Sequence, residues 1–77
     1  MNEMKWIPVY DVVPGSTEIV LITLDYGDLG FCEVTTGVYM ENKEGKHEWF
    51  ERRDEFDKIP DNSKVVAWMR LPKPYTE

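Results

Sequence analysis

The chain has 77 residues, and its fifteen acidic and nine basic side chains give a net charge of −6. This length predicts a single domain over residues 1–77. A hydrophobic content of 42%, with three Trp, three Phe and four Tyr, is too high for a disordered chain. The acidic balance argues against binding to a nucleic-acid backbone or to an anionic membrane surface, because both need clustered Lys and Arg.

The composition also predicts a compartment. The longest apolar run, residues 19–22, is far shorter than the roughly 20 residues that span a bilayer. The first residues show no basic region followed by a long apolar core, so no secretory signal is expected. Cys32 is the only cysteine, which excludes an internal disulfide and fits a reducing environment. We therefore expect a cytoplasmic protein with no membrane contact.

The first third of the chain predicts an edge strand, a turn and a central strand. Residues 6–9 are expected to be extended at a sheet edge, because Pro8 has no N–H to donate to an interior strand pair. Residues 14–17, with the sequence Pro-Gly-Ser-Thr, predict a turn. Residues 19–24 are apolar on both alternating faces, which predicts the central strand of the sheet.

The middle of the chain predicts a long hairpin after a loop at residues 25–30. One face of its first strand is mainly apolar and consists of Cys32, Val34, Thr36, Val38 and Met40. The Cys32 thiol is expected to be buried there as a small hydrophobic group. A four-residue loop at 42–45 would set Val38 opposite Trp49 and Gly37 opposite Phe50.

The last third predicts a short helical turn, a closing strand and a tail. Residues 51–58 place acidic side chains before Lys58, a charge order that favours one or two helical turns. Residues 60–63 predict a turn, residues 64–70 a strand, and residues 72–77 an extended, proline-rich tail. The whole predicts a mainly β fold, a small antiparallel sheet curled into a sandwich or partial barrel. An α+β fold is the alternative if the helical turn forms.

Two motifs stand near opposite ends of the chain. They are Trp6-Ile7-Pro8-Val9-Tyr10-Asp11-Val12-Val13-Pro14 and Val65-Val66-Ala67-Trp68-Met69-Arg70-Leu71-Pro72-Lys73-Pro74. Together with the strand at 19–22, they resemble the phage- and prophage-associated family called domain of unknown function 551. Members of that family open with Trp-Ile-x-Val-x-Asp-x-x-Pro and close with Trp-Met-x-Leu-Pro-x-Pro. The resemblance implies a phage-type protein that acts in the host cytoplasm, and it names no activity.

The chain departs from the family pattern at both motifs. Ala67 stands where relatives commonly have a histidine, and Gly15 stands where they have an acidic residue. Arg70, Lys73 and Tyr75 replace a proline, an acidic residue and a proline, so the end of this chain is basic and aromatic and its choice of partner is expected to differ. The motif residues with an expected structural role are Trp6, Pro14, Trp68, Leu71, Pro72 and Pro74.

No pattern in the sequence predicts catalysis, a metal or a cofactor. Cys32 and His47 are the only cysteine–histidine pair, and a core cysteine beside a hairpin histidine explains them better than a catalytic dyad. Zinc sites need clustered Cys and His ligands, and neither acidic stretch has the ligand spacing of a calcium loop. Gly27 and Gly30 do not lead into a phosphate-binding helix. We therefore predict a non-enzymatic protein.

Two sets of residues are candidates for a partner surface. The aromatic set consists of Trp6, Tyr10, Trp49, Trp68 and Tyr75, because Trp and Tyr are enriched where proteins dock, and the candidates for the partner surface within it are Trp49, Trp68 and Tyr75. Packing of Trp6 against Trp68 on paired terminal strands is the competing explanation. The acidic set consists of Asp54, Glu55 and Asp57. The first set predicts an accessory module that binds a host or phage protein. The second predicts an acidic inhibitor of a host nucleic-acid-binding or defence protein. The sequence leaves the oligomeric state open.

Overall fold

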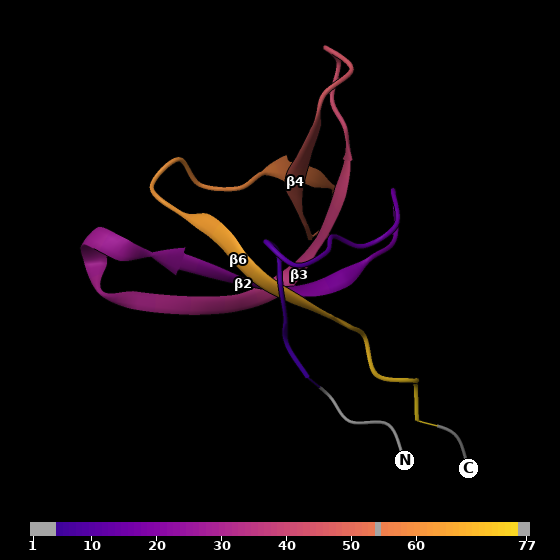
Figure 1. Cartoon of the computed structure of the whole chain (residues 1–77), viewed down its shortest axis with the longest axis horizontal. Coiled ribbons are helices and arrows are strands. Elements are labelled where there is room, and N and C mark those ends of the chain that lie inside the picture. The colour runs from indigo at the N-terminus through magenta and orange to yellow at the C-terminus, as the bar shows by residue number, and fades with distance from the viewer. Residues whose placement is uncertain (1–4, 54, 76–77) are drawn as a thin grey trace.

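The computed structural model describes residues 5–53 and 55–75, which form one antiparallel sheet of six strands (Figure 1). The strands are β1 (Ile7–Pro8), β2 (Val20–Tyr26), β3 (Phe31–Glu41), β4 (His47–Arg52), β5 (Phe56–Lys58) and β6 (Lys64–Arg70). Their order in the sheet is β1-β6-β2-β3-β4-β5. The predicted mainly β fold is therefore confirmed, as a single curled sheet that does not close into a barrel.

The central strand of the sheet is β2, which pairs with β3 on one side and β6 on the other. Its side chains alternate between buried and half-buried, and Val20, Ile22 and Leu24 are fully buried. This alternation follows from the period of two in a strand, which sends successive side chains to opposite faces. The predicted spine of the sheet is thus confirmed.

The hydrophobic core lies on the face of β2 that carries these side chains. Trp68 on β6 stands directly opposite Ile22 and is only 2% exposed. Its indole Nε1–H donates a hydrogen bond to the carbonyl oxygen of Val12 at 2.8 Å, and Val9 packs against the same cluster. The segment that follows β1 therefore covers the tryptophan and provides the hydrogen-bond acceptor that a buried indole needs.

The terminal strands β1 and β6 pair with each other, but Trp6 precedes β1 and is 41% exposed, so the predicted packing of Trp6 against the buried Trp68 is not found. Ile7 stands opposite Trp68, and Pro8 opposite Ala67, which places β1 at the sheet edge predicted from Pro8. Because the strands are antiparallel, residues 5–6 and residues 71–75 leave the sheet at the same end (Figure 1). Of the predicted proline-rich tail, residues 72–75 form no strand or helix, and residues 76–77 lie outside the described part of the chain.

The faces of β3 are not those predicted. Cys32 is exposed and Val34 is 56% exposed, so the first half of the predicted buried face is wrong. The register with β2 explains this, since Glu33 stands opposite Leu24 and therefore shares the core face. Farther along the strand, Val38 is buried on the predicted face.

The register of the β3–β4 hairpin is one residue away from the prediction. Val38 stands opposite Phe50, and Trp49 stands opposite Tyr39 instead. The loop holds an extra residue because Gly45 adopts a left-handed φ of 81°, which forms a bulge after the turn. Each side chain of β4 consequently lies on the opposite face from the one predicted.

The helical turn predicted for residues 51–58 is wrong. Phe56–Lys58 is instead the edge strand β5, which pairs with β4 and puts Asp57 opposite Glu51. The helical residues described are the single 3₁₀ turn η1 (Gly27–Leu29), which joins β2 to β3. A segment as short as 51–58 has too few turns for an independent helix, so the open edge of β4 decides its conformation.

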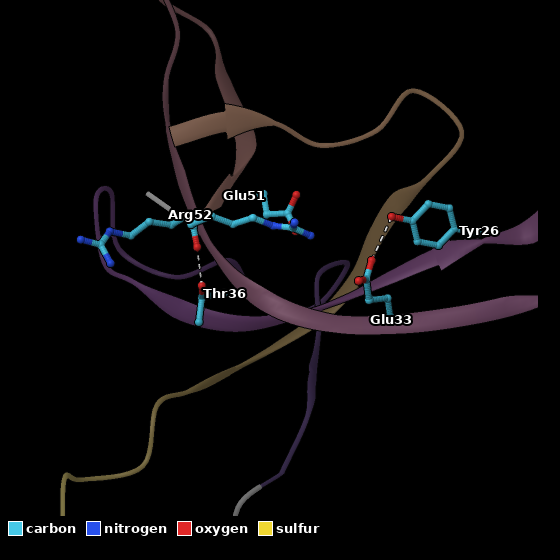
Figure 2. Close-up of polar contacts among 6 residues, drawn as sticks. Tyr26, Glu33, Thr36, Glu51 and Arg52 are labelled. Carbon is cyan, nitrogen blue, oxygen red and sulfur yellow. Dashed lines mark hydrogen bonds and ion pairs between the residues drawn. The ribbon is translucent and has the colours of Figure 1, made fainter. Parts of the chain in front are cut away.

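Two side-chain contacts satisfy buried polar groups on the core face of the sheet. Figure 2 shows the Tyr26 hydroxyl directed at Glu33, to which it donates a hydrogen bond of 3.0 Å. Burial, reinforced by that hydrogen bond, raises the pKa of Tyr26. Glu51 is only 6% exposed, and the Arg53 guanidinium donates to it through Nε and Nη2 at 3.0 and 2.8 Å. The hydrogen bond and the charge of Glu51 raise the pKa of Arg53 further, so the buried carboxylate is compensated.

Candidate protein-binding surface

The structure separates the residues of the predicted partner surface. Trp68 lies in the core and is not available to a partner. Tyr75 is 88% exposed on the tail, while Glu55 and Asp57 are exposed at β5, and Asp54 lies outside the described residues. Trp49 is half-buried on β4. Trp68 is therefore removed from the predicted partner surface, while Trp49 packs against the core on one side and stays partly exposed.

The motif residues divide into buried and exposed positions. Pro14 and Trp68 are buried, which agrees with a structural role for both. Trp6 and Leu71 are about two-fifths exposed, at 41% and 43%. Pro72 and Pro74 are exposed in the tail. Of the six motif residues, Pro14 and Trp68 are therefore the two that are buried in the fold.

Trp49 belongs to a row of three rings, Tyr39, His47 and Trp49, which we call the ring cluster. The ring centroids of Tyr39 and Trp49 are 5.0 Å apart and tilted by 51°, and those of Tyr39 and His47 are 5.4 Å apart. The cluster exists because the register sets Tyr39 opposite Trp49 and one diagonal step from His47, within reach of aromatic side chains. His47 is exposed and the other two rings are half-buried.

Carboxylates flank the ring cluster on the same face of the sheet. Glu41 stands directly opposite His47, and Asp57 stands directly opposite Glu51, which shares its face with Trp49. Both Glu41 and Asp57 are exposed. Aromatic faces beside carboxylates attract cations, through cation–π contact with the rings and Coulomb attraction to the acids. The chemistry of this face therefore suits a Lys or Arg side chain.

The opposite face of the same hairpin carries an open groove of about 640 Å³. Its lining consists of Met40, Glu41, Asn42, Lys43, Glu44, Glu48, Phe50 and Lys58. The Asn42 amide holds one wall, since its Nδ2 donates to Glu48 at 2.7 Å and its Oδ1 accepts from the backbone N–H of Glu44 at 2.8 Å. The lining mixes both charges with two apolar side chains, so it selects no single ligand class.

Sequence reasoning missed two members of the ring cluster, Tyr39 and His47. Alternation along β3 and β4 was the available signal, but it needed the correct hairpin register. Gly45 indicates the correct register, because a glycine at the end of a hairpin loop is typical of a turn followed by a bulge, which adds one residue to the loop.

The structure brings no catalytic or metal-binding group together among the described residues. Cys32 lies near the start of β3, whereas His47 stands opposite Glu41 at the end of β3, so the two side chains are far apart along the sheet. Within residues 5–53 and 55–75 there is no cluster of three metal-ligating side chains. The same ranges contain no helix long and apolar enough to cross a membrane.

Comparisons with protein-family models, with curated proteins and with solved structures give no significant match to this chain. The resemblance to the phage-associated family therefore remains a prediction from the two terminal motifs.

Proposed function

We propose that this protein is a non-enzymatic accessory module that binds a basic host or phage protein through the ring cluster and its flanking carboxylates. The observation that carries the proposal is the row of Tyr39, His47 and Trp49 between the exposed acids Glu41 and Asp57. Partly exposed aromatic side chains are enriched at protein interfaces and supply much of their binding energy. The family expectation, a phage-type protein in the host cytoplasm, is compatible with such a role.

The test compares the tagged protein with variants of the ring cluster in affinity capture from host lysate, with and without phage infection. His47→Ala removes an exposed ring, so it leaves the core unchanged, and Tyr39→Ala removes the ring shared by both contacts. We expect each variant to lose the specifically captured protein, because truncating an aromatic anchor typically costs 1 kcal/mol or more, about a fivefold loss of affinity.

Matched controls are Tyr10→Ala and Tyr75→Ala, which remove rings that are 86% and 88% exposed outside the ring cluster. Both controls should capture the same protein as the wild type. Equal capture by the ring-cluster variants and the wild type would contradict the proposal. Loss with Tyr75→Ala alone would move the binding surface to the tail.

The acidic-inhibitor function receives less support from the geometry. A mimic of a phosphate array needs a row of carboxylates, but Arg52, Arg53 and Lys58 interrupt the acidic residues along the segment 51–58. The two functions differ in one measurement. Capture of nucleic-acid-binding proteins that is lost at high salt and competed by DNA would favour the inhibitor.

A further inference from the structure

The outer edge of β5 is the most accessible strand edge of the described sheet. β5 is the last strand in the sheet order, and all three of its residues are exposed. The other edge strand, β1, contains Pro8, which cannot donate a backbone hydrogen bond. An edge strand without proline offers a row of N–H and C=O groups to an added strand.

One backbone hydrogen bond beside the β4–β5 pair indicates which backbone groups of β5 point outward. The N–H of Arg53 donates to the C=O of Glu55 at 3.1 Å, so these two residues form a hydrogen-bonded pair that continues the register of Glu51 with Asp57. Along an antiparallel pair, successive residues point alternately toward one neighbour and the other. Asp57 therefore directs its N–H and C=O toward β4. Phe56 and Lys58 direct theirs away from the sheet.

Charge indicates what pairs with this edge. If two copies of the chain paired antiparallel about the middle of β5, Asp57 would stand directly opposite the Asp57 of the second copy. Like charges in that position destabilise strand pairing, and each copy carries a net charge of −6. A strand with a basic residue opposite Asp57 would be stabilised by charge attraction at the position where a second copy would be destabilised by repulsion.

The ring cluster strengthens this preference. A residue opposite Asp57 shares its face, which is also the face of Glu51 and Trp49. A long Arg or Lys side chain at that position lies beside the Asp57 carboxylate and extends over β4 toward the rings. The residues on either side of it point to the other face, where they meet the exposed Lys58 and Phe56, whose ring centroid lies 5.9 Å from the guanidinium carbon of Arg52.

We infer that the partner binds by adding an extended segment to β5 as a seventh strand, with an Arg or Lys opposite Asp57 and apolar residues on either side. This inference rests on the proposed function and names its mode of recognition. The added main-chain hydrogen bonds supply affinity, and the alternation of basic and apolar side chains supplies specificity.

The probe for this inference is the capped peptide acetyl-Val-Arg-Val-Arg-Val-amide, titrated into the full chain and followed by calorimetry and by amide hydrogen exchange. The amides of Phe56 and Lys58 should exchange rapidly in the free protein and become protected when the peptide binds. A peptide N-methylated on the residues that pair with β5 should bind at least about tenfold more weakly, because it cannot donate those bonds.

A charge variant and its matched control complete the design. Asp57→Lys should weaken peptide binding about tenfold, whereas Asp61→Lys makes the same charge change at an exposed turn and should leave binding close to that of the wild type. Equal weakening by both variants would show a non-specific charge effect and overturn the inference.

Two further outcomes would overturn it. Equal affinity for the N-methylated peptide, or binding without protection of Phe56 and Lys58, excludes strand addition. Protection of these amides in the free protein that rises with concentration would show that a second copy occupies the edge. If the peptide fails while His47→Ala and Tyr39→Ala still abolish capture, the proposed function stands and only this mode of binding falls.

Discussion

Gly37 shows most directly how one side chain sets the packing of this sheet. It is buried on β3 between Ile22 of β2 and the backbone of β4. A Cβ at this position would lie 2.7 Å from Cδ1 of Ile22 and 2.7 Å from the carbonyl oxygen of Phe50. The carbonyl belongs to a paired strand and cannot turn aside, so glycine is required by close approach.

We expect Gly37→Ala to destabilise the protein by about 1–3 kcal/mol, the usual cost of forcing an extra methyl group into a filled core. Urea unfolding followed by circular dichroism measures the loss. Gly27→Ala is the matched control, because a Cβ there has no atom within 4 Å, and its effect should stay within about 0.5 kcal/mol. Equal stability of the two variants would mean that β3 and β4 are farther apart than described.

Tyr26 gives the protein a predictable response to alkaline pH. Burial and the hydrogen bond to Glu33 raise its pKa in the folded state above the value of about 10 in an unfolded chain. Its contribution to stability is therefore complete below about pH 10 and is lost as the pH rises through the raised pKa.

Tyr26→Phe should remove this alkaline loss while keeping the ring that stacks on Phe31 at 4.8 Å. The measurement is the urea midpoint of wild type and variant at neutral pH and above about pH 10. Tyr75→Phe, at an exposed position, controls for the titration of other groups. The expectation fails if the wild type and Tyr26→Phe lose stability in parallel.

At the scale of elements, the β3–β4 hairpin depends on its loop. Asn42 accepts hydrogen bonds from the backbone N–H groups of Glu44 and Lys46 through Oδ1, at 2.8 and 3.0 Å. Gly45 follows in the left-handed conformation, which shifts the pairing so that Tyr39 meets Trp49. The loop therefore decides which rings form the candidate surface.

Replacing the left-handed glycine tests this dependence. Gly45→Ala should cost about 1–2 kcal/mol, since a Cβ is disfavoured at positive φ, and Gly45→Asn should cost less because asparagine tolerates that conformation. Thermal unfolding measures both variants. A loss in Gly45→Ala no greater than in Gly45→Asn would argue against the described turn.

The same element shows how far sequence alone reaches. The strand at β2, the edge position of Pro8 and the closing strand β6 follow from local pattern, and they were predicted. The candidate surface was only partly predicted, through Trp49 and Asp57, because its other rings depend on a one-residue difference in register. Such a difference changes no composition or periodicity, yet it moves every side chain of a strand to the other face.

At the scale of the whole molecule, burial also depends on partners that pattern does not reveal. Cys32 lies in an apolar alternation, but the register with β2 turns it outward, where it is exposed. From sequence, Trp68 was a candidate surface anchor with core packing as the favoured alternative, and the structure places it in the core, covered by the segment after β1. The charge order of residues 51–58 favours a helix only weakly. Hydrogen bonding to the open edge of β4 outweighs that preference, so residues 56–58 form the strand β5.

The position of β6 between β1 and β2 has a consequence for the order of folding. The hairpins β2–β3 and β3–β4 close short loops, whereas the pairing of Thr23 with Ala67 joins distant parts of the chain at a larger entropic cost. During synthesis, β2 is exposed along one edge until residues 64–70 have left the ribosome. A chain that stops before Lys64 leaves β1 with no strand to join.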